Sequence, residues 1–123
     1  MEAFEKQDVP VAIETDDAQL RTTEAGDMTV AFMTLEQGAD FGPALQGLPD
    51  DKCQCPHWGY MLKGTVRMHT TAGHQDFVAG EAFYWAPGHA PEALEDSEYV
   101  DFSPTHELEQ VVEHIRSGAA ASA

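Results

Sequence analysis

Two cysteines and a histidine stand at alternate positions in the run Cys53-Gln54-Cys55-Pro56-His57. Side chains alternate between the two faces of an extended backbone, so Cys53, Cys55 and His57 are expected to point to the same side. Thiolate sulfur and imidazole nitrogen are ligands that transition metals commonly take in proteins. The spacing therefore predicts a metal site at this point of the chain.

Short strands are the elements expected to position this run. Apolar and β-branched residues form segments of strand length, separated by glycine-containing turns. An N-terminal edge strand around residues 9–13 is also expected, at an edge because Pro10 cannot donate to a ladder. The remaining expected strands cover residues 29–35, 58–62, 65–70, 75–78, 82–85 and 98–102. Short strands at this spacing predict an all-β fold, an antiparallel sandwich or barrel.

One helix is expected at the C-terminal end. Leu108, Val111, Val112 and Ile115 recur at the spacing of an amphipathic helix that packs on the sheet, and Gly118 is expected to end it. Without internal repeats, the chain is interpreted as one domain. It divides into an N-terminal arm with an edge strand over residues 1–27, a β-barrel over 28–103 and the helix over 104–118.

Composition limits the classes of partner. The chain has 123 residues, 42% of them hydrophobic, and 22 acidic against 6 basic residues give a net charge of -16. Such a charge repels phosphate backbones and anionic lipids, so we expect neither a nucleic-acid nor a membrane partner. The start is acidic and lacks the features of a secretion signal, and there is no apolar run of about 18 residues. A cytoplasmic location with both cysteines reduced is therefore expected.

Two motifs resemble those of the cupin family, in its small single-domain (cupin-2-like) form. Tyr60-Met61-Leu62-Lys63-Gly64 is similar to the strand that ends the first cupin motif, and the segment from Gly80 to Pro87-Gly88-His89 is similar to the second. The resemblance spans about residues 28 to 103. It implies a cupin-type antiparallel β-barrel, or jelly roll, with the short C-terminal helix packed on it. It also implies a homodimer that pairs through strand edges and outer sheet faces.

The departures from the family fall on its ligand positions. His57 stands where the family has a glutamate, and Cys53 and Asp51 stand where it has two histidines. Pro91 occupies the histidine position of the second motif, and His89 lies two residues earlier. An even step keeps His89 on the same side of a regular strand. The first motif is thus an atypical Cys-x-Cys-x-His version of the cupin pattern.

The metal ligands expected from the residues and the resemblance together are Cys53, Cys55, His57 and His89. They would hold one divalent transition metal per chain, with zinc favoured by the sulfur and nitrogen donors and iron or copper as alternatives. The metal, and with it a small ligand, would lie inside the barrel. A site with four protein donors would be structural, whereas three donors would leave a position for water or substrate.

Three other interpretations stay open at this stage. Cupin dioxygenase or isomerase chemistry would use His57, His89 and Asp51, since iron oxygenases commonly take two histidines and a carboxylate. Cys53 and Cys55 could instead form a thiol redox or metal sensor without catalysis. Finally, both cysteines could be buried as small hydrophobic side chains, with His57 a hydrogen-bonded core histidine.

Overall fold

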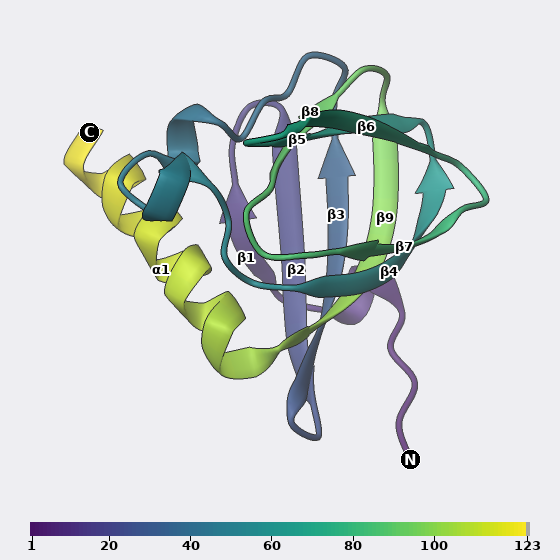
Figure 1. The fold of residues 1–123 in the computed structure, drawn as a ribbon. Coiled ribbons are helices and arrows are strands. Elements are labelled where there is room, and N and C mark those ends of the chain that lie inside the picture. The colour runs from purple at the N-terminus through teal and green to yellow at the C-terminus, as the bar shows by residue number, and fades with distance from the viewer. Residues whose placement is uncertain (123) are drawn as a thin grey trace.

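The protein is a two-sheet β-barrel with one helix along its side, as the computed structural model of residues 1–122 shows (Figure 1). Every strand pairing is antiparallel. The larger sheet has the strand order β1-β2-β3-β9-β4-β7, and the smaller has the order β6-β5-β8. The strands are β1 Val11–Glu14, β2 Ala18–Ala25, β3 Met28–Leu35, β4 His57–Lys63, β5 Thr65–Thr70, β6 Gly73–Val78, β7 Ala82–Trp85, β8 Ala90–Ala93 and β9 Ser97–Pro104.

The helical elements are α1 and three short 3-10 turns. The turns are η1 Lys6–Asp8, η2 Pro43–Leu45 and η3 Pro49–Asp51, and the helix is α1 Thr105–Ser122. Leu108, Val111 and Val112 are buried and join the main core cluster, so the predicted apolar face of the helix is confirmed. The helix continues past Gly118, where the sequence predicted its end, because alanines, which have the highest helix propensity, follow that glycine.

The prediction of an all-β fold with a C-terminal helix is confirmed. Two strands were missed, however. β2 carries arginine, threonine and glutamate and has no clear alternation, and it forms because eight of its residues pair with β3. β8 is short and contains Pro91, which strand propensity disfavours, and it is held by pairing with β5.

Turn geometry explains the glycine that separates β4 from β5. Gly64 has a φ of +79°, and a Cβ at this position would lie 2.3 Å from the Asp96 carbonyl oxygen. Only glycine fits a turn that combines a left-handed backbone with so close an approach. The turn folds the chain from the larger sheet into the smaller one, so the two sheets face each other across the core (Figure 1).

Candidate metal centre

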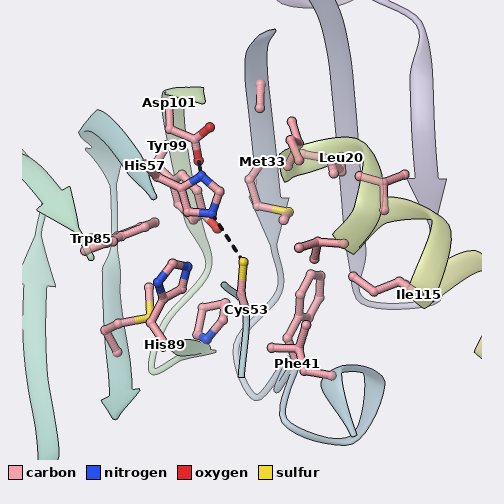
Figure 2. Close-up of a pocket in the computed structure, with 17 residues that line it drawn as sticks. Leu20, Met33, Phe41, Cys53, His57, Trp85, His89, Tyr99, Asp101 and Ile115 are labelled. Atoms are coloured by element: carbon pink, nitrogen blue, oxygen red, sulfur yellow. Dashed lines mark hydrogen bonds and ion pairs between the residues drawn. The ribbon is translucent and has the colours of Figure 1, made fainter. Parts of the chain in front are cut away.

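Three donor side chains meet inside the barrel. Cys53 Sγ and one ring nitrogen each of His57 and His89 lie within 4.8 Å of one another, and all three residues are buried. Figure 2 shows the three side chains pointing toward a common region. The rings of His57 and His89 have their centroids 4.9 Å apart in an edge-to-face arrangement. The structure thus brings together three of the four residues that the sequence indicated.

The main chain places Cys53 and His89 side by side. The Cys53 amide donates to the His89 carbonyl at 2.8 Å, and the His89 amide donates back to the Cys53 carbonyl at 3.2 Å. The Gly88 amide also donates to the Cys53 carbonyl, at 2.7 Å. This isolated bridge lies outside the named strands, in the loops that precede β4 and β8. Two distant parts of the chain are therefore fixed in register at the candidate metal centre.

Hydrogen bonds hold both histidine rings with one nitrogen turned toward the cluster. His57 Nδ1 lies 2.5 Å from Ser103 Oγ, which in turn donates to Asp101 Oδ1 at 3.3 Å. A hydroxyl that donates to a carboxylate can accept from an N–H, so this pairing favours a proton on His57 Nδ1. His57 Nε2 then presents its lone pair toward Cys53 Sγ, 3.7 Å away. The sequence did not point to Ser103 or Asp101 as neighbours of the site.

His89 is oriented in the same way by the backbone. Its Nδ1 lies 2.6 Å from the Ala86 carbonyl oxygen, which can only accept, so Nδ1 carries the proton. Its Nε2 is therefore unprotonated. Metal-ligating histidines usually donate their second nitrogen to a carbonyl or a carboxylate in this manner. Both rings are in the tautomer that a metal requires.

Burial sets the protonation states of the cluster. It lowers the pKa of His57 and of His89 to about 4, and the neighbouring His57 adds to the effect on His89. Both imidazoles are neutral near pH 7, the form that binds metals. Burial also raises the pKa of the Cys53 thiol to about 11 and that of Cys55 to about 12. In the metal-free protein both cysteines are therefore thiols rather than thiolates.

A buried carboxyl group from β9 lies behind His57. Asp101 Oδ2 is 3.9 Å from His57 Nδ1, and burial raises the pKa of this carboxyl to about 7 although Ser103 donates to it. Gly59 makes room for it, since a Cβ there would lie 2.9 Å from Asp101 Cβ and 2.4 Å from Phe83 Cζ. The close packing of β4, β7 and β9 at this level thus depends on a glycine in β4.

Cys55 lies apart from the other three predicted ligands. It is completely buried, and its Sγ is 3.4 Å from the Pro56 carbonyl oxygen. The segment from Cys53 to Pro56 is bent rather than extended, and β4 begins only at His57. The alternation that would place Cys55 beside Cys53 therefore does not hold, because the chain bends at Cys55.

Asp51, the carboxylate that the alternative iron site requires, also lies outside the cluster. It is exposed at the end of η3, where its Oδ1 accepts a hydrogen bond from the Gly47 amide at 2.9 Å. The set of His57, His89 and Asp51 is therefore not assembled in this structure. The carboxyl group nearest to the two histidines is that of Asp101 instead.

A small cavity adjoins the three donors. It has a volume of about 50 Å³ and lies between the two sheets and α1. The helix supplies part of an apolar wall opposite Cys53, His57 and His89, and Figure 2 shows Ile115, Leu20 and Met33 on that side. Trp85, Tyr99 and Asp101 line the remainder beside the histidines. A metal held by the three donors would thus face this cavity.

Comparison with known proteins defines the fold. No protein-family model and no curated protein matches the chain. Solved structures do match. An RmlC-like cupin from Shewanella frigidimarina is 12% identical with a TM-score of 0.60, over 85% of this chain and 92% of the other. KdgF from Halomonas sp. is 23% identical with a TM-score of 0.61, over 85% of this chain and 94% of that protein.

Oxalate decarboxylase from Bacillus subtilis gives the same result over part of its length. It is 20% identical with a TM-score of 0.61, and the match covers 82% of this chain but 28% of the decarboxylase. Together these likenesses establish that the chain has the cupin jelly-roll fold that its two motifs indicated. Separately, no helix within residues 1–122 is long and apolar enough to cross a bilayer.

Proposed function

We propose that the protein is a metal-binding cupin that holds one divalent transition metal through Cys53 Sγ, His57 Nε2 and His89 Nε2. The observation that carries this proposal is the convergence of three buried donors within 4.8 Å of one another. The ring tautomers support the proposal, because His57 Nδ1 is hydrogen-bonded to Ser103 and His89 Nδ1 is hydrogen-bonded to the Ala86 carbonyl. Buried donor atoms whose tautomer is fixed by such hydrogen bonds are expected of metal ligands, whereas packing alone does not require them.

Zinc is the metal that this donor set favours. One sulfur and two nitrogens suit Zn²⁺, while iron and copper are the alternatives to be tested against it. Three protein donors leave one coordination position, as in catalytic zinc sites, and the three donors line the cavity. When bound, such a metal supplies Lewis acidity and lowers the pKa of a water molecule that it holds.

A thiol redox sensor receives less support than metal binding. Redox-active cysteines are partly exposed and have a lowered pKa, because the thiolate is the reactive form. Cys53 and Cys55 are buried, and burial raises the pKa of both thiols, to about 11 and about 12. The dioxygenase alternative lacks its carboxylate, since Asp51 is exposed on its loop.

The test combines metal analysis with a pair of cysteine variants. Zinc-loaded protein should carry one zinc per chain, and its X-ray absorption spectrum should fit one sulfur and nitrogen or oxygen for the remaining ligands. Cys53→Ala should lose the zinc. Cys55→Ala removes the same buried thiol group two residues away and should keep it. Two sulfurs in the spectrum, or equal zinc loss in both variants, would contradict the three-donor site, and protein that takes up no metal would contradict the proposal as a whole.

A further inference from the structure

Two methionine residues line the same cavity as the three candidate ligands. They are Met33 of β3 and Met68 of β5, and both are buried. Thioether sulfur is a soft ligand that selects Cu(I), and a methionine beside two histidines and one cysteine is typical of copper sites. The cavity lining thus holds a candidate fourth ligand for the metal centre.

Met33 lies on the wall of the cavity opposite the three donors. That wall is formed by β2, β3, α1 and the segment that contains η2, and its other side chains consist of carbon and hydrogen alone. Within the described part of the chain, the Met33 sulfur is therefore the only side-chain atom of this wall that can bind a metal ion. Figure 2 shows Met33 across the cavity from His89.

The Met33 side chain can turn toward an ion held by the three donors. Methionine is unbranched and has three rotatable bonds, so its sulfur adapts its position at small cost. The cavity of about 50 Å³ between this wall and the donors leaves room for that movement. A leucine of similar volume would pack against Leu20, the partner of Met33 across β2 and β3, about as well. Packing alone therefore does not require a sulfur at this position.

The other donor atoms of the cavity lining are less suited to the fourth position. Asp101 lies beside Nδ1 of His57, the nitrogen that is turned away from the cluster. The Tyr99 hydroxyl is an oxygen donor, and oxygen ligands suit harder ions than sulfur does. Met68 stands beside one ligand and not opposite all three, because it pairs with Pro91 and shares a second, outer groove with His89.

We propose that the centre binds copper, with the Met33 thioether as a fourth ligand beside Cys53, His57 and His89. One thiolate, two imidazoles and a weakly bound methionine sulfur form a donor set that copper takes, and sites of nitrogen and sulfur bind Cu²⁺ more tightly than Zn²⁺. A zinc ion at the same three donors would be completed by water and would leave Met33 unbound. This inference rests on the proposed function, because the three donors of that site are the other ligands.

Methyl NMR tests whether the Met33 sulfur binds the ion. Protein labelled with ¹³C in the methionine methyl groups is titrated with Zn²⁺ and, without oxygen, with Cu(I), since both ions are diamagnetic. Cu(I) should shift the Met33 methyl resonance, which is assigned by its loss in Met33→Leu, and zinc should shift it much less. Met61 is the internal control, because it is buried in β4 and does not line the cavity. Equal shifts of the Met33 resonance with the two ions would overturn the role of Met33.

A matched set of variants tests the contribution of the thioether to affinity. Met33→Leu conserves volume and should weaken Cu(I) binding about tenfold, which is about 1.4 kcal/mol, in competition with a chromogenic Cu(I) chelator. Its zinc affinity should equal that of the unmodified protein. Met61→Leu makes the same substitution away from the cavity and should leave both affinities unchanged.

The outcomes separate this inference from the proposed function. Protein that binds neither zinc nor Cu(I), or a Cys53→Ala variant that keeps both ions, would contradict both. If Cys53→Ala loses both ions while Met33→Leu binds Cu(I) as tightly as the unmodified protein, the metal site stands and the role of Met33 is overturned. Loss of Cu(I) affinity in Met68→Leu in place of Met33→Leu would overturn it as well. A Cu(I) affinity below that for zinc would overturn the choice of copper.

Discussion

Cys53 and His89 are joined by two reciprocal backbone hydrogen bonds, although they belong to separate loops. Two of the three candidate ligands are therefore positioned by each other's main chain and not by a regular strand. Only His57 is a strand residue, at the start of β4. The geometry of the candidate metal centre thus depends on the turn that brings Gly88 and His89 against Cys53.

Gly88→Ala tests this dependence. Gly88 has a φ of +97°, which an alanine adopts only with strain of about 1–2 kcal/mol, and its amide donates to the Cys53 carbonyl. We expect a loss of stability of that order in urea unfolding and a fall in zinc affinity of about tenfold, measured by competition with a chelator. Altered backbone at residue 88 would disturb the bridge that aligns Cys53 with His89.

Gly80→Ala is the matched control. Gly80 has a φ of +94°, and, as at Gly88, a Cβ there would meet nothing within 4 Å. This variant should lose a similar amount of stability and keep the zinc affinity of the unmodified protein. Equal zinc affinity in the two variants would show that the bridge does not position the ligands.

Ser103→Ala tests how His57 is held in the metal-binding tautomer. Without the hydroxyl, His57 Nδ1 loses its partner at 2.5 Å, and the nearest carboxylate oxygen, Asp101 Oδ2, is 3.9 Å away. Removing such a supporting group lowers metal affinity by about 10–100-fold, so we expect a loss in that range. The ¹⁵N shifts of the His57 ring in the metal-free variant should show a mixture of tautomers.

Ser97→Ala is the comparison for Ser103→Ala, because Ser97 is a buried serine on the same strand. Its hydroxyl donates to the carbonyls of Thr65 and Glu95, away from the metal cluster. This variant should leave both zinc affinity and the His57 ring shifts unchanged. A single unchanged tautomer in Ser103→Ala would contradict the role assigned to that hydroxyl.

The local pattern of strand-forming residues and turn glycines was sufficient to predict much of the fold. The expected bounds of β5 and β7 agree with the structure, and the glycine turns around them were found from the sequence. β2 and β8 were not predicted, because these strands are stabilised by pairing with β3 and β5 and not by their own composition. Strand propensity depends on such neighbours, which a single sequence does not display.

The candidate site could be predicted where its residues are close in the sequence or stand in a recognisable motif, as His89 does. Cys53 and His57 were indicated by spacing, whereas the assumption of an extended backbone does not hold at Cys55, where the chain bends. Asp101 and Ser103 were missed for a different reason. They lie on the inward face of β9, while Val100 and Phe102 of the same strand face outward, so hydrophobicity would suggest the opposite orientation.

Asp101→Asn should change how the stability of the metal-free protein depends on pH. The folded-state pKa of Asp101 is about 7, above the ordinary value of 3.8 that applies to the unfolded chain. The folded state therefore holds this proton more tightly, and stability is lost as the pH rises from about 4 to about 7. Over that interval the loss amounts to at most about 4 kcal/mol.

The Asp101→Asn variant has no carboxyl group at this position that could lose a proton, whereas the histidines titrate in both proteins. The unfolding free energy of Asp101→Asn, relative to the unmodified protein, should therefore rise between pH 4.5 and pH 8. Urea unfolding in the presence of a chelator measures it at each pH. A constant or falling difference would show that Asp101 is not a buried carboxyl group with a raised pKa.

The outer face of the larger sheet is expected to be covered by a second copy of the chain, as the resemblance to small cupins implies. Tyr84, Trp58 and Phe102 are cross-strand neighbours on β7, β4 and β9, and each is 43–53% exposed. Trp58 and Tyr84 already contact each other, with ring centroids 5.2 Å apart. Aromatic side chains in such a row are typical of interface cores.

Sedimentation equilibrium tests this expectation through its dependence on salt. Two chains with a net charge of -16 each repel one another, so raising the ionic strength should tighten a dimer held by apolar contacts. Replacing Trp58 and Tyr84 with serine should shift the protein to monomer at every salt concentration, with zinc still bound. Gln37→Ser, an exposed change outside this face, should have no effect on association. A monomeric unmodified protein at high salt would contradict the expectation, since no repulsion would then remain to oppose pairing of the aromatic faces.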